Sequence, residues 1–207
     1  EGKYYFPRRA SAPLAVESRN FEKAKLRLYR MFPSNIALAV EDIYDGEAGW
    51  AFSNSWAEPL AEKEVRLNLR TNQLAETPLA VESLFLTNRR GVFCLEAEGV
   101  REESEEYYHG TREARKILVW TDIGLLAHWD ANGLAVFAHD LYSLAPIAQA
   151  DVTVYSTKNQ VLGKASTGED GTARLSNFNP SYGEPNVVVV EHGDDYAFLD
   201  LEKREED

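Results

Sequence analysis

Apolar and polar residues alternate along several short stretches of this chain, and the alternation predicts β-strands. Residues 25–30 and 64–70 place apolar and polar side chains on opposite faces, as a half-buried strand requires. From Ile117 to Trp129 the odd positions are mainly apolar, so we expect them to line one face of a long or bent strand.

Turn residues separate the predicted strands at short intervals. The pair Asn132-Gly133 tolerates positive φ and lies between two apolar runs, which predicts a hairpin. Short strands separated by turns about every 8–12 residues are typical of antiparallel sandwiches and not of βαβ units. The other predicted strands cover residues 91–97, 151–155, 163–167, 172–175, 187–190 and 196–201.

Helical patterns are weak. Residues 101–116 are the best helix candidate, but they contain Gly110 and show no apolar stripe, so a loop or one short helix is expected there. In residues 20–31 the alternation of Leu26 and Leu28 favours a strand. We therefore predict an all-β protein with two tandem immunoglobulin- or fibronectin-like antiparallel β-sandwiches: residues 1–116, with an N-terminal extension and inserts, and residues 117–207.

One hexapeptide, Pro-Leu-Ala-Val-Glu-Ser, occurs at residues 13–18 and again at residues 78–83. The flanking residues differ, so the repeat does not predict a duplicated unit. We expect each proline to mark the entry to a strand, at an edge or first position where its missing N–H does no harm.

Charge supports a division of the chain into two units. The chain has 22 Lys and Arg against 34 Asp and Glu, a net charge of −12. Residues 1–118 carry 17 basic and 19 acidic side chains, and residues 119–207 carry 5 and 15, so the net charges are −2 and −10. This excess of acid argues against nucleic acid as a partner. Residues 1–30 are locally basic, as either a solvated face or a contact with an acidic neighbour.

Cysteine usage and hydropathy exclude other classes. One cysteine excludes an internal disulfide framework and a multi-cysteine metal site. The longest apolar runs, such as residues 187–190, are far below the ~20 residues that cross a bilayer, so we expect no membrane insertion. The first residues do not resemble a signal peptide, and we interpret the chain as part of a longer one.

Motifs for catalysis, cofactors and metals are absent from the sequence, and we predict no catalytic, cofactor-binding or metal-binding residues. His139 is the only histidine beside a carboxylate, and a hydrogen-bonded strand-end histidine is the simpler interpretation. Two acidic turns, at residues 169–170 and 194–195, could suggest calcium. Neither shows the alternating ligands of a calcium loop, and Asp is common in tight turns.

Aromatic residues gather between residues 44 and 56, with Trp50 and Trp56 among them. A carbohydrate-binding module would stack sugars on such side chains. The alternative is that they cover the end of the first sandwich. Trp50 and Trp56 are therefore the candidate sugar-stacking residues of an alternative hypothesis, in which the chain is an Ig-like adhesion or carbohydrate- or peptidoglycan-binding tandem.

Cys94 begins the sequence Cys94-Leu95-Glu96-Ala97, which nearly matches the internal thioester motif C-x-E-Q. Ala97 has no acyl group to offer, so the thioester cannot form in that way. Val92, Cys94 and Glu96 alternate with Phe93, Leu95 and Ala97, which predicts a strand that carries a structural thiol.

Five segments of the second half resemble, in order and spacing, a macroglobulin (MG) domain of the bacterial alpha-2-macroglobulins. The resemblance covers about residues 117–203, and the first half is more loosely similar through residues 26–31 and 91–97. The five segments are residues 121–125, 133–137, 143–152, 165–175 and 194–201.

This resemblance implies a function that the residue pattern alone does not give. Members of the family are periplasmic protease traps, in which a ladder of MG domains carries a bait segment and a downstream thioester domain. The chain would be two consecutive MG domains of the N-terminal half, a non-enzymatic scaffold without the thioester. The implied partners are neighbouring MG domains and, through the full-length protein, target proteases, in the periplasm of a cell whose parent protein is membrane-anchored or secreted across the inner membrane.

Overall fold

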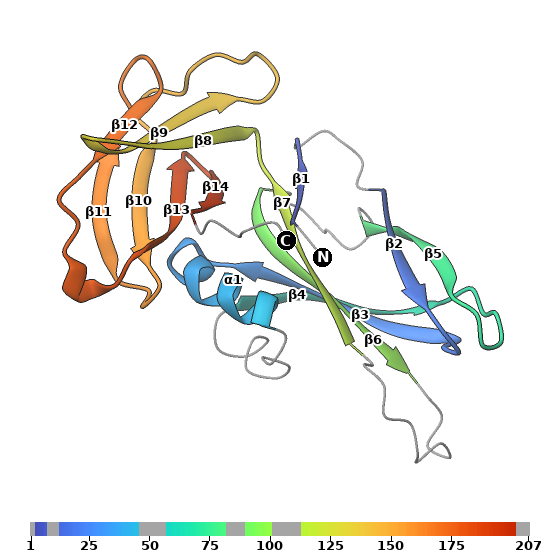
Figure 1. The fold of residues 1–207 in the computed structure, drawn as a ribbon. Helices are drawn as coiled ribbons and strands as arrows, with labels where there is room; N and C mark the ends of the chain where they lie inside the picture. Colours follow the sequence, from blue (N-terminus) through green and yellow to red (C-terminus); the bar gives the residue numbers. More distant parts are fainter. Residues whose placement is uncertain (1–2, 8–12, 46–56, 82–89, 101–112, 202–207) are drawn as a thin grey trace.

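The computed structural model describes residues 3–7, 13–45, 57–81, 90–100 and 113–201, which form two β-rich units side by side (Figure 1). The first unit is built on a five-stranded sheet in the order β1-β7-β6-β3-β4. Strand β1 runs parallel to β7, and the other neighbours are antiparallel. The strands are β1 (Lys3–Phe6), β3 (Lys23–Met31), β4 (Ala57–Arg66), β6 (Gly91–Val100) and β7 (Glu113–Trp120).

Two smaller elements cover this sheet. Strands β2 (Pro13–Ser18) and β5 (Ala75–Ala80) form an antiparallel pair on one face. On the other face lie a 3-10 turn at Pro33–Asn35 and helix α1 (Ile36–Asp45), between the sheet and the second unit (Figure 1). Helix α1 buries its side chains at i, i+1, i+3 and i+4, which is one face of a helix: Ile36, Ala37, Ala39 and Val40.

The second unit is a sandwich of two sheets, with strand orders β11-β10-β13-β14 and β12-β9-β8. Strands β8 and β9 form the predicted hairpin, with Ala131 and Asn132 in the turn and Gly133 at φ 120°. Strand β14 lies against β8, and β11 against β12, so the two sheets meet along both edges. The bounds are β8 (Ile123–Asp130), β9 (Gly133–Asp140), β10 (Asp151–Ser156), β11 (Val161–Ser166), β12 (Thr172–Leu175), β13 (Pro185–His192) and β14 (Asp195–Asp200).

The repeated hexapeptide pairs with itself. Leu14 lies opposite Leu79, and each repeat's proline lies opposite an alanine of the other copy: Pro13 with Ala80 and Pro78 with Ala15. Both leucines pack into the core between β2–β5 and the large sheet. Pro13 begins β2, as predicted, whereas Pro78 lies inside β5 and does not mark the entry to the strand, although it is at an edge, as the prediction allowed. A two-stranded sheet tolerates an internal proline because both of its strands are edges.

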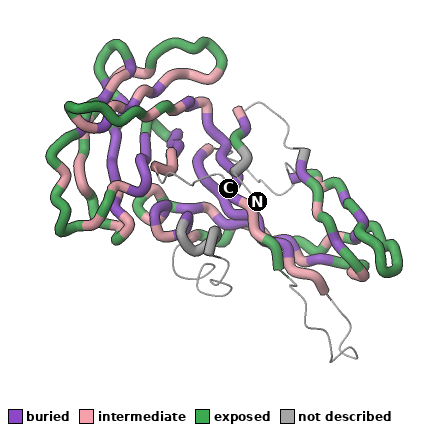
Figure 2. The backbone as a smooth tube through the Cα atoms, viewed as in Figure 1, coloured by how far each residue is buried: buried purple, intermediate pink, exposed green. Residues whose placement is uncertain are grey.

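The buried apolar residues form three hydrophobic cores. One fills the space between the large sheet and β2–β5, and a second fills the sandwich of the second unit. The third contains residues of both units: Tyr29, Met31, Val92, Cys94, Ile117 and Val119 of the large sheet, part of α1, and Val187, Val189, Tyr196 and Phe198 of the second unit. In Figure 2 the buried backbone continues through the centre of the molecule from one unit into the other. We call this third core the shared core.

The all-β fold class is confirmed, and the predicted strand at residues 20–31 is β3. The helix expectation was wrong in its position: α1 at residues 36–45 was not predicted, and residues 113–116 of the candidate helix are strand. The rest of that candidate lies outside the described residues. The strand expected from Ile117 to Trp129 is broken by Thr121 and Asp122 into β7 and β8. The expected domain boundary at residues 116/117 falls inside β7, and the two-domain division stays a prediction.

Candidate functional site: the joint between the two units

The joint is the contact between the large sheet with α1 and strands β13 and β14 of the second unit. This contact forms because successive side chains along a strand point to opposite faces of the sheet. In β13 the odd residues Val187 and Val189 enter the shared core, and the even residues Val188 and Val190 enter the core of the second unit. A run of four valines is therefore buried on both faces, which fits a strand between two cores. The apolar packing of the joint resembles a domain interior.

Hydrogen bonds from two tyrosines cross the joint. The Tyr196 hydroxyl of β14 donates to the Met31 carbonyl (2.5 Å), and the Tyr5 hydroxyl of β1 donates to the Phe198 carbonyl (2.7 Å). Burial raises the pKa of Tyr196, so its hydroxyl stays a donor. The Tyr196 ring fills the space where a Cβ of Gly91 would lie, and Gly91 has φ 103°, so glycine permits this close approach.

The covalent link between the units is short and hydrogen-bonded. It consists of Thr121 and Asp122, between β7 and β8. Thr121 N–H donates to the Phe6 carbonyl of β1 (3.2 Å), and Asp122 N–H donates to Asp195 Oδ2 of β14 (2.9 Å). The Asp122 carbonyl accepts from Leu141 N–H (2.8 Å). Because both units hold this link, it does not act as a free hinge.

Asp195 carries a titratable group at this link. The side chain is buried, and Oδ1 has no hydrogen-bond partner among the described residues. Burial raises the pKa of Asp195, opposed by the hydrogen bond from Asp122 N–H, and the nearby Asp122 carboxylate raises it further. Because burial disfavours the charged carboxylate, an ionised Asp195 destabilises the folded state. The adjacent Asp194 pairs with Arg90 of the first unit.

Replacing Asp195 with asparagine is expected to raise the melting temperature at pH 7 by a few degrees. The folded-state pKa lies above the unfolded one, so the penalty exists at neutral pH and disappears as the pH falls through the folded pKa towards about 4. The difference between variant and wild type should therefore shrink on acidification. Thermal unfolding at a series of pH values measures it, and a difference independent of pH would contradict the assignment.

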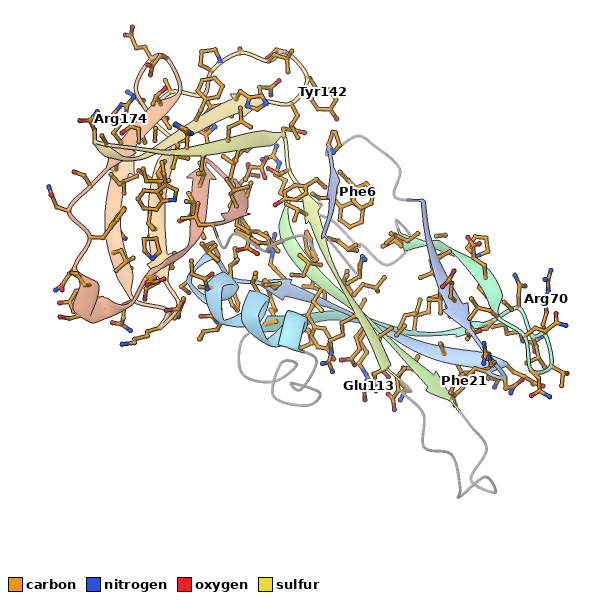
Figure 3. The ribbon with its side chains drawn as sticks, viewed as in Figure 1. Phe6, Phe21, Arg70, Glu113, Tyr142 and Arg174 are labelled. Atoms are coloured by element: carbon orange, nitrogen blue, oxygen red, sulfur yellow. The ribbon has the colours of Figure 1, made fainter. Side chains whose placement is uncertain are left out.

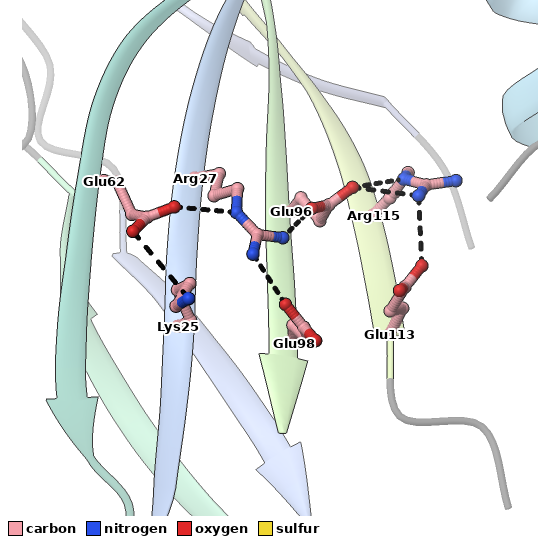
Figure 4. A network of polar contacts seen from close by, with 7 residues as sticks. All are labelled: Lys25, Arg27, Glu62, Glu96, Glu98, Glu113 and Arg115. Atoms are coloured by element: carbon pink, nitrogen blue, oxygen red, sulfur yellow. Dashed lines mark hydrogen bonds and ion pairs between the residues drawn. The ribbon is translucent and has the colours of Figure 1, made fainter. Parts of the chain in front are cut away.

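Beyond the joint, the same face of the large sheet carries a network of charged side chains (Figure 4). Glu96 is almost fully buried in β6 and binds two guanidinium groups. Its Oε1 accepts from Arg27 Nη1 (2.7 Å), and its Oε2 accepts from Arg115 Nε (2.9 Å). Arg27 also donates to Glu62 (2.9 Å) and Glu98 (2.7 Å). These hydrogen bonds, first that of Glu96, raise the pKa of Arg27.

This network gives partners to part of the basic stretch at residues 1–30. Lys23 pairs with Glu64 (3.0 Å), and Lys25 lies 3.8 Å from Glu62. The acidic partners of these lysines and of Arg27 belong to the first unit's own sheet and not to the second unit. Lys23 and Lys25 are partly exposed and pair within their own sheet, so these described residues favour a solvated face over an acidic neighbour across the junction.

Cys94 lies within the shared core. It is fully buried in β6, opposite Tyr29 of β3 and Ile117 of β7. Burial raises the pKa of the thiol to about 12. Ala97 faces the other core, on the opposite face of β6, so the near-match to the thioester motif does not form one site.

Cys94 is expected to react with a thiol reagent such as DTNB at least ~1,000-fold more slowly in the folded protein than in denaturant, because the thiolate is the nucleophile and is scarce at pH 8. Absorbance at 412 nm follows the reaction. A folded chain that reacts within seconds would contradict the buried, structural thiol.

The other sequence candidates are scattered. Trp50 and Trp56 lie outside the described residues, so the stacking hypothesis stays a prediction. His139 lies in β9, where its ring stacks on Phe137 (5.6 Å between centroids). Among the described residues there is no group of three or more His, Cys, Asp or Glu side chains that could hold a metal ion. Nor does any described helix have the length and apolar character of a membrane span.

Sequence reasoning missed the Glu96 network and the tyrosine contacts of the joint. The signal for Glu96 was present, because the alternation in β6 places it on the same face as the buried Val92 and Cys94. No local signal marks Tyr196 or Tyr5, since their acceptors, Met31 and Phe198, are distant in sequence.

Comparisons with known proteins agree with this architecture. Residues 120–207 match the family model described as the bacterial alpha-2-macroglobulin MG3 domain. A crystal structure of native Escherichia coli alpha-2-macroglobulin spanning domains NIE-MG1 is similar over 96% of this chain and 94% of its own, with 19% identity and a TM-score of 0.71. A search of curated proteins finds no match.

Longer relatives match as well. The E. coli fragment spanning domains MG0-NIE-MG1 has 18% identity and a TM-score of 0.66, over 93% of this chain and 59% of that one. A Salmonella alpha-2-macroglobulin mutant has 19% identity and a TM-score of 0.68, over 94% of this chain and 11% of that one. The chain thus spans about a tenth of the Salmonella protein.

The class of protein is therefore a β-sandwich protein with the fold seen in alpha-2-macroglobulin structures. Residues 120–207 match the model of the bacterial alpha-2-macroglobulin MG3 domain, which confirms the resemblance found in the sequence for this region, and the likeness to the solved structures shows a shared fold.

Proposed function

We propose that this chain is a rigid scaffold within a periplasmic alpha-2-macroglobulin-like protease trap, without catalytic or capture chemistry of its own. The observation that carries the proposal is the shared core, which holds two β-units in one fixed orientation. A trap built from many domains needs such fixed junctions to position distant parts. The two units, residues 1–116 and 117–207 in the proposed division, would serve as consecutive MG-type modules.

The chemistry of the described residues supports a non-enzymatic role. The single thiol is buried, with a pKa raised to about 12, and Ala97 cannot supply the acyl group of a thioester. The buried carboxylate of Glu96 is occupied by two arginines and is unavailable as a general base. Partners of this scaffold would be neighbouring domains of the parent chain and, through the whole protein, target proteases.

The test uses the isolated 207-residue chain and its parent. The chain alone should neither inhibit trypsin nor form a covalent adduct with it, and methylamine should release no thiol. In the parent, Cys94→Ala should leave protease inhibition within twofold of wild type, whereas replacing a cysteine of a C-x-E-Q motif elsewhere in the parent should abolish covalent capture. A covalent adduct on the isolated chain, or loss of inhibition with Cys94→Ala in a folded parent, would overturn the scaffold role.

A further inference from the structure

The segment 140–146, which is the last residue of β9 and the loop after it, presents two large apolar side chains to solvent. Leu144 is 70% exposed and Tyr142 is 51% exposed. Figure 3 shows Tyr142 on the loop after β9, at the upper end of the second unit and on the side towards Phe6. We call residues 140–146 the anchor loop.

The anchor loop is held in one conformation by hydrogen bonds. Asp140 Oδ1 accepts from Tyr142 N–H (3.0 Å), Ser143 N–H (2.7 Å) and Ser143 Oγ (2.8 Å). The Asp140 backbone also bonds to Leu144 N–H (2.9 Å) and to the Ala145 carbonyl (2.8 Å). An exposed side chain on an ordered loop loses little entropy when a partner covers it, which favours binding.

Leu144 holds an unfavourable backbone conformation. Its φ is 59°, in the left-handed region that costs a leucine about 1 kcal/mol and a glycine almost nothing. A leucine with this backbone conformation and a side chain that is 70% exposed contributes little to the stability of its own fold. This points to a contact made outside the described chain.

The anchor loop continues into an apolar face of the β12-β9-β8 sheet. Leu126 is 62% exposed and lies directly opposite Phe137. A Cβ at Gly171 would touch both Phe137 and Pro146, so the loop and this face adjoin. Leu141 packs over Gly124, which shares its face of β8 with Leu126. The His139 ring also lies over Gly124 and stacks on Phe137, so the loop and this face of the sheet adjoin around a histidine.

Charge and chain length indicate what covers this surface. Residues 121–201 contain 3 Lys and Arg against 11 Asp and Glu, so phosphate-bearing partners such as lipid headgroups and nucleic acid are repelled. A protein surface with an apolar pocket and a basic rim is complementary. The chain covers 11% of the Salmonella relative, so most of such a protein lies outside this structure.

We propose that the anchor loop and the Leu126–Phe137 face dock against another domain of the parent chain, with Leu144 inserted in an apolar pocket whose rim carries Lys or Arg. The proposal rests on the proposed function, in which the chain is part of a multidomain protein. Leu144 would act as the anchor of the contact, and Tyr142 and Leu126 would border it.

Hydrogen exchange of residues 141–147 in the isolated chain and in the intact parent tests the proposal. Exchange should be at least tenfold slower in the parent. Leu144→Gly should abolish that difference, and it should leave the melting temperature of the isolated chain unchanged or higher because glycine relieves the φ strain. The matched control is Tyr182→Ala, at an exposed aromatic residue elsewhere in the second unit, which should preserve the difference.

Equal exchange in chain and parent, or protection that survives Leu144→Gly, would overturn the docking site. Either result leaves the scaffold role intact, since that role depends on the shared core and on the inertness of the isolated chain to proteases. The opposite result, a docked loop on a chain that captures trypsin, would refute the scaffold role alone.

Discussion

Phe198→Ala is expected to destabilise the protein by about 3–5 kcal/mol, the range for removing a fully buried aromatic ring. Phe198 has no exposed surface and lies in the shared core, although it belongs to the second unit. The loss is a large fraction of an ordinary domain's stability. It should weaken the first unit as well, because Tyr29, Met31 and part of α1 lose packing.

Urea denaturation followed by circular dichroism measures the loss, and hydrogen exchange locates it. The matched control is Leu134→Ala, which opens a cavity in the core of the second unit without touching the shared core. Leu134→Ala should shift the unfolding of both units together. Phe198→Ala should separate their midpoints, because it weakens the coupling itself. If Phe198→Ala cost less than ~1 kcal/mol, the ring would not be packed as described.

The second large effect is expected at Glu96. Glu96→Ala should cost about 3 kcal/mol, because it leaves the guanidinium groups of Arg27 and Arg115 without their shared, buried carboxylate. The partial exposure of Arg27 limits the loss, since water can solvate it. At the exposed end of the same network, Glu113→Ala should cost less than ~1 kcal/mol.

A triple variant separates a charge effect from a packing effect. Arg27→Met with Glu96→Leu and Arg115→Met replaces the network by apolar side chains and should recover most of the stability lost in Glu96→Ala. Chemical denaturation of the three proteins provides the comparison. If the triple variant were less stable than Glu96→Ala, the favourable interaction free energy of the network would exceed the free-energy cost of desolvating its charges.

Period-2 alternation predicted the all-β class and many of the strands, but only residues 64–66 of the strand expected at residues 64–70 belong to β4, and β1 was not predicted. The Asn132-Gly133 pair located the hairpin, and the valine run at residues 187–190 located a strand. The family resemblance of the second half also came from local segments, and the family model covers the same region. These features depend on neighbouring residues, so a sequence carries them directly.

Features made by distant residues were beyond sequence patterns. Helix α1 is short, and its apolar face is buried in the shared core by residues of the large sheet and of the second unit, which lie far away in the sequence. The shared core joins residues from Tyr29 to Phe198, and nothing in the valine run indicates which valines face which core. In the sequence Glu96 is one of several polar positions in a strand. Its two partners, Arg27 and Arg115, are on neighbouring strands that only the sheet pairing identifies.

The central claim is that the two units are one cooperative body held by the shared core, and native-state hydrogen exchange in increasing urea tests it most directly. The amides of β3 and β6 report on the first unit, and those of β10 and β13 on the second. The account predicts that both sets become exposed in a single transition, with the same midpoint and the same free energy of unfolding. Two separate midpoints in the wild-type chain would contradict it.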